Sequence, residues 1–302
     1  MAIAKAPRYS STWLELREAA DAQARAAGLA QQVQRHLTGP LVVHDLGCGT
    51  GSMARWLSPR LPDPQHWVLH DRDADLLEIA ADSIGSPAET RLGDLTAITA
   101  ADLAGASLVT CSALLDILTY DEIDRLARAC TSTGSPALFT LTVIGRVDLA
   151  PWEPLDNVLC DAFNDHLRGG SRATGRRPLG PAAADAAAEA FRRYGATVQV
   201  RETPWRLGAD RAGQAGCAGD AELIAEWLRG FVSAAAAQLP DSADLGTDAY
   251  LERRLAQALA GDLRVTVEHV DLLALPAPRG SHGVSFGTPR FDDPSISFGG
   301  AQ

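Results

Sequence analysis

The sequence predicts an α/β protein with a doubly wound, mostly parallel sheet of seven strands. Short apolar runs alternate with helical segments from about residue 40 to residue 145. A turn with three glycines directly follows the first of these apolar runs. Because strands separated by helices of this length are joined by right-handed crossovers, we expect one sheet covered by helices on both faces.

Composition narrows the classes of protein that the chain can represent. Its 302 residues, 46% of them hydrophobic, can bury a large core without disulfide or metal staples. The 38 acidic and 27 basic residues give a net charge of −11, which disfavours a nucleic-acid partner. The chain has neither a run of about 18 apolar residues nor an apolar leader segment, so we expect no membrane span and no signal peptide. The five cysteines are scattered without a CxxC pair, which fits a reducing, cytoplasmic location.

The first half of the chain alternates between helix and strand. Residues 11–38 should be helical, with an interruption at Gly28 and an end at Gly39-Pro40. Helices are also expected directly after the glycine turn and at 74–84 and 120–130. The first five strands are expected at 41–45, 67–70, 90–92, 107–111 and 137–143.

The second half is less regular. Helices are expected at 156–168, from Gly180-Pro181 to about residue 194, and at 221–238 and 247–260. Strands are expected at 197–200 and 263–275, with the long final strand antiparallel. We therefore expect a helical N-terminal lid (1–39), a main domain (40–275) and an irregular or disordered tail (276–302). Within the main domain, residues 204–262 should form a helical insertion, either a cap over the substrate site or a dimer surface.

The glycine turn carries the main functional signal. An apolar strand ends in Asp45, and Gly47, Gly49 and Gly51 follow before a helix. Glycines allow a sharp turn and close approach of a ligand at the carboxyl edge of the first strand, which is the expected binding crevice. A dinucleotide turn is spaced GxGxxG, and an acid beside it would repel a pyrophosphate but suit a cationic amino group. A phosphate loop would need a GK[ST] ending, which is absent.

The segment Asp45-Leu46-Gly47-Cys48-Gly49-Thr50-Gly51 resembles the first motif of the class I S-adenosylmethionine-dependent methyltransferases. Asp71 follows 26 positions after Asp45 at the end of the second strand, and Asp94 follows 23 positions later after the third. In this family the first of these acids accepts the ribose hydroxyls and the second bonds the adenine amino group. Residues 109–116 resemble the fourth-strand motif beneath the sulfonium.

The resemblance implies a Rossmann-like fold and S-adenosylmethionine as cofactor. It covers residues 40–145 well and the rest loosely. An arginine of an N-terminal helix reaches the cofactor carboxylate in similar proteins, and Arg17 is the matching residue here. The expected cofactor-binding residues are Asp45, Gly47, Cys48, Gly49, Thr50, Gly51, Asp71, Arg72, Gly93, Asp94, Leu95, Cys111, Ser112 and Arg17.

Methyl transfer is an in-line displacement, so the protein mainly positions the nucleophile and excludes water. No clustered His, Asp and Glu set predicts a metal site. His166 and Asp116 are the candidate catalytic bases. Alternatively, His166 is an exposed histidine on a helix and Asp116 is an acid at a helix start, without a catalytic role. Asn164, Trp13 and Arg168 are the candidate substrate contacts. Arg168 belongs to a basic cluster with Arg172, Arg176 and Arg177 that is also explained as a solvated loop.

A small-molecule acceptor is the leading interpretation, with oxygen, nitrogen and carbon acceptors open. The stretch after the fourth strand, Cys111-Ser112-Ala113-Leu114, lacks the [ND]PP[FYW] tetrad of enzymes that methylate adenine or glutamine nitrogens. It also lacks the Pro-Cys nucleophile of cytosine C5 enzymes. A homodimer is possible. The alternatives are a non-catalytic domain that binds the cofactor or a partner protein and, less favoured, a dinucleotide-dependent oxidoreductase.

Overall fold

The computed structural model describes residues 9–169, 175–208, 220–239 and 244–277. Its helices are α1 (Ser11–Ala24), α2 (Ala27–His36), α3 (Ser52–Leu57), α4 (Ala74–Ser83), α5 (Tyr120–Thr133), α6 (Leu155–Arg168), α7 (Ala183–Arg193), α8 (Asp220–Ala236) and α9 (Thr247–Leu259). Short 3-10 turns are η1 (Ser58–Arg60), η2 (Leu95–Ala97), η3 (Leu115–Ile117) and η4 (Gly180–Ala182). The strands are β1 (Leu41–Leu46), β2 (Gln65–Asp71), β3 (Ala88–Leu92), β4 (Leu108–Ser112), β5 (Ala137–Ala150), β6 (Thr197–Glu202), β7 (Trp205–Leu207) and β8 (Arg264–Leu275).

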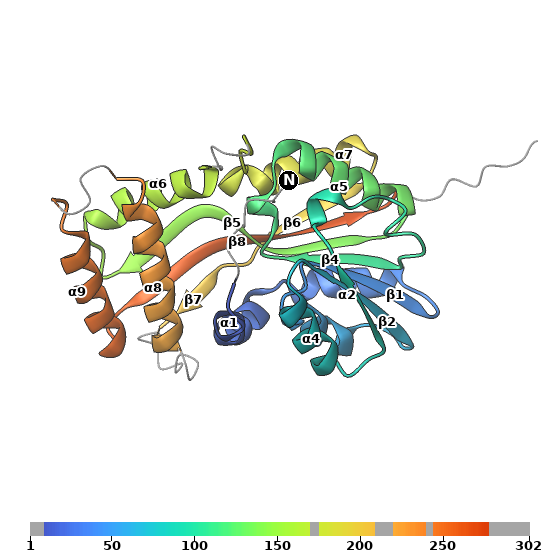
Figure 1. Cartoon of the computed structure of the whole chain (residues 1–302), viewed down its shortest axis with the longest axis horizontal. Coiled ribbons are helices and arrows are strands. Elements are labelled where there is room, and N and C mark those ends of the chain that lie inside the picture. The colour runs from blue at the N-terminus through green and yellow to red at the C-terminus, as the bar shows by residue number, and fades with distance from the viewer. Residues whose placement is uncertain (1–8, 170–174, 209–219, 240–243, 278–302) are drawn as a thin grey trace, which may run out of the picture.

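One mixed sheet organises the chain, in the order β3-β2-β1-β4-β5-β8-β6, with β7 beside β8 (Figure 1). Strands β1 to β5 are parallel, and β8 runs antiparallel to β5, β6 and β7. The predicted fold class is therefore confirmed: the seven predicted strands are present and the last one is antiparallel. The eighth strand, β7, was not predicted; it lies within the segment assigned to the helical insertion.

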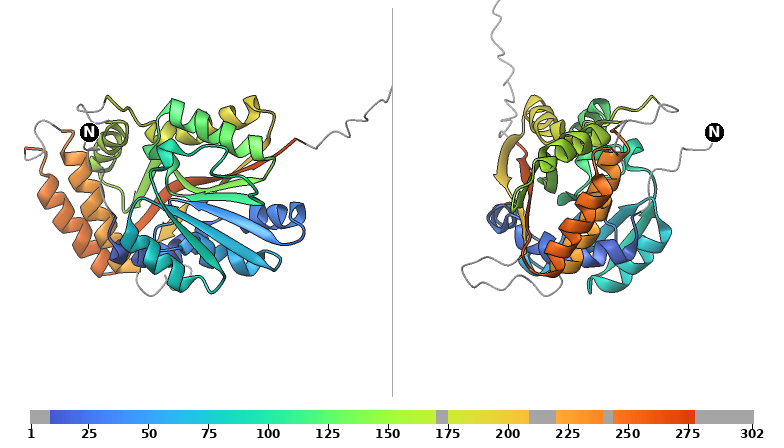
Figure 2. Two further views of the ribbon diagram at one scale, coloured as in Figure 1. Left: turned by 45° about the vertical axis from the view of Figure 1, so that its right-hand side comes forward. Right: turned by 90° about the vertical axis from the view of Figure 1, so that its left-hand side faces the viewer.

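Helices cover both faces of the sheet (Figure 2). On one face, residues of α2, α3 and α4 pack on strand residues such as Val43, Trp67 and Leu69. On the other face, α5 and α7 pack on residues such as Leu46, Val109 and Phe139. Apolar side chains alternate to the two sides because successive strand residues point to opposite faces. These two cores fix the carboxyl ends of β1, β2 and β4 at one edge of the sheet.

The long strands β5 and β8 extend past the ends of the neighbouring strands and reach a second group of helices. Strand β5 was predicted to end at residue 143, but it continues to Ala150 because its second half pairs with the first half of β8. Two bulges, between Phe139 and Thr142 and between Val143 and Val147, separate the halves. A third core there joins residues of α1, α6, α8, α9 and β7 (Figure 1).

The break between the N-terminal helices differs from the prediction. Helix α1 ends at Ala24 and α2 begins at Ala27, so the chain turns at Arg25-Ala26, whereas Gly28 lies inside α2. Arg25 has an extended backbone (φ −52°, ψ 136°). Arg172, residues 209–219 and 240–243 of the predicted insertion, and the tail from residue 278 lie outside the described residues. In the described part of the chain, no helix is long and apolar enough to cross a membrane.

Candidate active site

The glycine turn joins β1 to α3 and is held against the end of β2. Gly47, Gly49 and Gly51 all have positive φ (68°, 54° and 86°), which favours glycine at each position. The amides of Gly47 and Cys48 donate to the carbonyl of His70, and the amide of Gly49 donates to Asp71 Oδ2 at 3.0 Å. The turn is therefore fixed in shape by the second strand.

Asp45 lies fully buried beneath this turn. Its Oδ1 accepts a hydrogen bond from Thr110 Oγ1 at 2.8 Å, whereas its Oδ2 is buried without a hydrogen-bond partner among the described residues. Burial raises the pKa of Asp45 to about 6, although Thr110 and Arg25 lower it. A buried carboxylate oxygen without a donor is costly, and a bound cation would relieve that cost.

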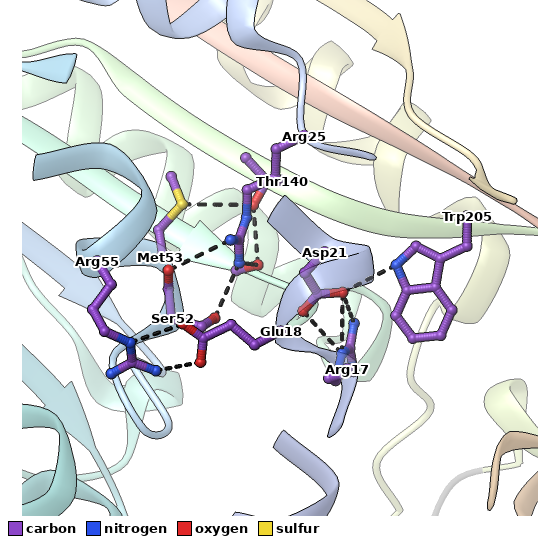
Figure 3. A network of polar contacts seen from close by, with 10 residues as sticks. Arg17, Glu18, Asp21, Arg25, Ser52, Met53, Arg55, Thr140 and Trp205 are labelled. Atoms are coloured by element: carbon purple, nitrogen blue, oxygen red, sulfur yellow. Dashed lines mark hydrogen bonds and ion pairs between the residues drawn. The ribbon is translucent and has the colours of Figure 1, made fainter. Parts of the chain in front are cut away.

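A buried cation lies near Asp45. Arg25 is 3% exposed, and its Nη2 donates to Ser52 Oγ at 3.1 Å and to Ser112 Oγ at 3.2 Å (Figure 3). Within the described ranges, no carboxylate lies at ion-pair distance from its guanidinium, and its Nε has no partner. Burial lowers the pKa of Arg25, opposed by the more distant charges of Asp21, Asp271 and Asp45. A buried carboxylate and a buried guanidinium beside one turn fit a zwitterion such as an α-amino acid group.

Arg17, which the sequence assigned to the cofactor carboxylate, is engaged elsewhere. Its Nε and Nη2 donate to the buried carboxylate of Asp21, which also accepts from Trp205 Nε1 at 3.0 Å (Figure 3). Its guanidinium lies 4.8 Å from the ring centroid of Trp205 and 5.9 Å from that of Trp13. Sequence analysis missed Arg25 because it counted this position within a continuous helical stretch.

Helix α1 lies over the glycine turn. Leu14 Cδ1 would be 3.1 Å from a Cβ atom at Gly49, so a side chain there would press on Leu14 in addition to the strain of the positive φ. Glu18 forms an ion pair with Arg55 of α3 (Figure 3). Arg55 also donates to the carbonyl of Thr50. The helix is therefore attached to the turn through both apolar and charged contacts.

The ends of β2 and β3 carry the two further acids. Asp71 Oδ1 accepts from the amide of Asp73 at 3.0 Å, so both of its oxygens have backbone partners. Asp94 is exposed, and its Oδ1 accepts from the amide of Thr96 at 2.9 Å. A recess of about 340 Å³ at this edge is lined by His70, Arg91, Leu92, Gly93, Asp94, Leu95, Ala97, Ile98 and Asp102.

The remaining cofactor candidates surround the same turn. Arg72 is exposed directly after Asp71, and Ser112 ends β4 beside Arg25. Cys48 and Cys111 are buried, and burial raises the pKa of both thiols. Their side chains belong to the two cores of the sheet, so the backbone at these positions, rather than the sulfur, is available to a ligand.

Asp116 in η3 follows β4 and is partly buried. Burial raises the pKa of Asp116 to about 6, and the nearby charge of Arg17 opposes this shift. Burial and then the carboxylate of Asp116 raise the pKa of Tyr9, whereas the charges of Arg17 and Arg72 lower it. A carboxylate with a raised pKa can take a proton from the hydroxyl or amine group that receives the methyl.

The candidates on α6 are placed differently. His166 is exposed, and its Nδ1 lies 3.4 Å from Gln238 Nε2. Asn164 donates to the carbonyl of Gly145 at 2.8 Å, and its Oδ1 is buried without a partner among the described residues. Arg168 is exposed and pairs with Asp165. These contacts connect the three residues to α6, to β5 and to the segment that follows α8, and none of them joins the glycine turn.

The basic cluster and the histidines also have local roles. Arg176 forms an ion pair with Glu122, the residue that completes the capping box of α5. His44 Nδ1 and His70 Nε2 lie 3.0 Å apart, buried between β1 and β2. Among the described residues, no group of three or more His, Cys, Asp and Glu side chains is arranged to hold a metal ion.

Comparison with known proteins gives one family match. Residues 43–136 match the family model described as a methyltransferase domain. A comparison with curated protein sequences gave no match.

The chain is also similar to solved structures at low identity. The cyclopropane synthase MmaA2 from Mycobacterium tuberculosis is 15% identical, with 82% of this chain and 83% of that chain covered and a TM-score of 0.42. A putative sarcosine dimethylglycine methyltransferase from Galdieria sulphuraria is 9% identical over 88% and 85%, with a TM-score of 0.41. A methyltransferase from Geobacter sulfurreducens in complex with S-adenosyl-L-homocysteine is 13% identical over 89% and 99%, with a TM-score of 0.44.

Proposed function

We propose that the chain is an S-adenosylmethionine-dependent methyltransferase that acts on a small-molecule acceptor, because residues 43–136 match a methyltransferase domain and contain the glycine turn with its acids. The observation that carries the cofactor assignment to this turn is the buried Asp45 carboxylate, whose Oδ2 has no donor among the described residues. The cofactor supplies an activated methyl group on a sulfonium. The chain supplies the binding, the orientation and the exclusion of water.

The residues around the turn fit the cofactor group by group. Asp45 suits the α-ammonium group, and Arg25 suits the α-carboxylate, because each is a buried charge with an unfilled hydrogen-bonding atom. Asp71, held by two backbone amides, suits the ribose hydroxyls. Asp94 and Leu95 line the recess at the end of β3, where a carboxylate oxygen and apolar side chains suit an adenine.

On the acceptor side, we assign Asp116 as the base and Tyr9, Trp13 and Arg17 as the surrounding surface. Asp116 follows β4, and its raised pKa lets it take a proton from an acceptor hydroxyl or amine. His166 is less suited, because it is exposed and its ring contacts Gln238, which follows the end of α8. Helix α1 covers the glycine turn and would exclude water from the reacting atoms.

The net charge of the chain and the position of α1 over the glycine turn both favour a small acceptor. The net charge of −11 disfavours a phosphate backbone as the acceptor. The test is release of S-adenosylhomocysteine with a panel of amines, phenols, carboxylic acids and thiols, alongside total RNA and total protein. We expect turnover with one class of small molecule and none with the macromolecules. Labelling of RNA or protein alone would contradict the proposal, and binding without turnover across all fractions would support the non-catalytic alternative.

A further inference from the structure

We propose that Asp271 is a positioning residue that sets the guanidinium of Arg25, and through it the affinity for the carboxylate of the cofactor. This inference rests on the proposed function, because it takes the Arg25 guanidinium as the carboxylate contact. Asp271 lies on β8, more than 240 positions from Arg25 in the sequence, and belongs to no motif of the glycine turn.

The carboxylate of Asp271 is buried and accepts hydrogen bonds from three separate segments of the chain. Asp271 is 1% exposed. Its Oδ2 accepts from the amide of Ala26 at 2.8 Å. Its Oδ1 accepts from the amide of Leu141 at 2.8 Å and from Thr203 Oγ1 at 3.0 Å. A buried carboxylate oxygen that loses its last donor is left unsatisfied, so Oδ2 holds the amide of Ala26 in place, whereas Oδ1 keeps the amide of Leu141 even without Thr203.

Two of these donors lie in unusual backbone. Leu141 has φ 56°, which is uncommon for a residue with a side chain, and it lies in the bulge of β5 opposite Asp271. Ala26 follows the turn at Arg25, where α1 ends and α2 begins. Asp271 therefore stabilises both the bulge and the turn between the N-terminal helices.

The same bulge also reaches the other end of the Arg25 side chain. Thr140 Oγ1 donates to Ser112 Oγ at 3.0 Å, and Ser112 Oγ accepts from Arg25 Nη2 at 3.2 Å. The backbone next to Arg25 and its guanidinium are thus both tied to the Thr140–Leu141 bulge, one through Asp271 and one through Ser112. The long side chain is ordered before any ligand binds, which reduces the entropy cost of binding.

Charge adds to this geometry. The guanidinium of Arg25 is buried without an ion-pair partner among the described residues, and Asp271 is one of the carboxylates that offset the effect of burial on its pKa. Asp271 is therefore close enough to favour the charged guanidinium without being within ion-pair distance. The edge of Arg25 that carries Nε stays available.

The test compares two ligands that differ only in the carboxylate. Dissociation constants are measured by calorimetry for S-adenosylmethionine and for decarboxylated S-adenosylmethionine, which keeps the ammonium. In Asp271→Asn we expect S-adenosylmethionine to bind at least about tenfold more weakly, because one buried acceptor becomes a donor, and the decarboxylated compound to change less than about twofold. General damage to the fold would weaken both ligands equally.

A second variant tests the same link with Asp271 intact. Ala26→Pro removes the amide donor and directs the ring Cδ at Asp271 Oδ2, so it breaks the contact between Asp271 and the turn, and the φ of Ala26 (−70°) suits proline. It should reproduce the selective loss, and it decides the question if Asp271→Asn does not fold. Thr203→Val is the matched control. It removes a different donor from the same carboxylate, and both affinities should stay within about twofold of the original.

The outcomes separate this inference from the proposed function. If Arg25→Ala loses the preference for the carboxylate and Asp271→Asn and Ala26→Pro do not, the positioning role is wrong and the assignment of Arg25 stands. If Arg25→Ala leaves the affinity for S-adenosylmethionine unchanged, the assignment of Arg25 itself fails. In the double variant Arg25→Ala with Asp271→Asn, no further selective loss is expected, and an additive loss would overturn the proposed coupling.

Discussion

Arg25 and Ser112, 87 positions apart in the sequence, meet through a 3.2 Å hydrogen bond between a buried guanidinium and the hydroxyl that ends β4. This contact places the turn between α1 and α2 against the end of β4, the strand that pairs with β1 in the sheet. The sheet therefore provides the acids of the site, and the N-terminal helices provide its cation.

The first prediction concerns that cation. Arg25→Ala should weaken the binding of S-adenosylmethionine by about 10- to 100-fold, because a hydrogen-bonded charge pair with the carboxylate is lost. Arg25→Lys should be intermediate, because an ammonium group cannot bind a carboxylate in bidentate fashion. The measurement is a calorimetric titration, with Arg35→Ala on the exposed side of α2 as the control. Equal affinities for Arg25→Ala and the unchanged chain would contradict the assignment.

The second prediction is a pH dependence of cofactor binding. Burial raises the pKa of Asp45 to about 6 in the free protein, and the ammonium group needs the ionised carboxylate. The affinity should therefore be constant well above pH 6 and fall by up to about tenfold for each unit below it. Binding should lose this pH dependence in Asp45→Asn, at much lower affinity.

Asp116 also has a pKa of about 6, so its effect must be separated from that of Asp45. Asp116→Asn should keep the pH dependence of the dissociation constant, because this carboxylate lies on the acceptor side. A pH profile of binding that disappears in Asp116→Asn would show that Asp45 is not the titrating group.

The third prediction distinguishes the two candidate bases. Asp116→Asn should lower kcat by about 10²- to 10⁴-fold if the acceptor must lose a proton, with little change in cofactor affinity. His166→Ala should leave kcat within about twofold, because His166 is exposed on α6 and bonded to Gln238. The assay needs an acceptor identified by the panel described above. Loss of activity in His166→Ala alone would reverse the assignment.

The fourth prediction concerns stability at acidic pH. Burial lowers the pKa of both His44 and His70 from 6.5 to about 4. Between pH 6.5 and pH 4 the unfolded chain binds protons at these positions and the folded chain does not. The contribution of this histidine pair to the free energy of unfolding should therefore fall as the pH falls through this window, by at most ~1.4 kcal/mol per unit for each group.

The measurement is urea unfolding at pH 7, 6 and 5. The contributions of Asp45 and Asp116 are common to the original chain and to the double variant His44→Gln with His70→Gln, so the free energy of unfolding of the original chain relative to that of the double variant should fall as the pH falls. Those two carboxylates have raised pKa values and contribute with the opposite sign. An equally steep dependence in the double variant would exclude the histidine pair as its source.

The sequence predicts the sheet well because its signals are local. Strands β1, β2 and β4 are mainly apolar runs followed by a glycine, an acid or a helix start, and these features appear within a few residues of one another. The length of β5 and the presence of β7 could not be predicted in this way. Both depend on pairing with β8, more than 50 residues away in sequence.

The residues of the site differ in the same way, because some lie in local motifs and others depend on long-range contacts. Asp45, Asp71 and Asp94 lie in local motifs, and the structure brings them to one edge of the sheet. In the sequence, Arg25 looks like a surface arginine of an amphipathic helix, and only the packing of α1 on the glycine turn buries it. Asp271 looks like one polar residue in a long strand. The α6 candidates carry reactive side-chain types, but their neighbours in the fold, rather than their chemistry, decide their roles.

The most direct test of the central claim is calorimetric titration of the folded chain with S-adenosylmethionine and, separately, with NADH. We expect one molecule of S-adenosylmethionine to bind per chain, at least about tenfold more weakly in Asp71→Ala because the ribose contact and the support of Gly49 are both lost. NADH should give no heat of binding. Absence of S-adenosylmethionine binding to well-folded protein, or saturable binding of NADH at the same turn, would contradict the account.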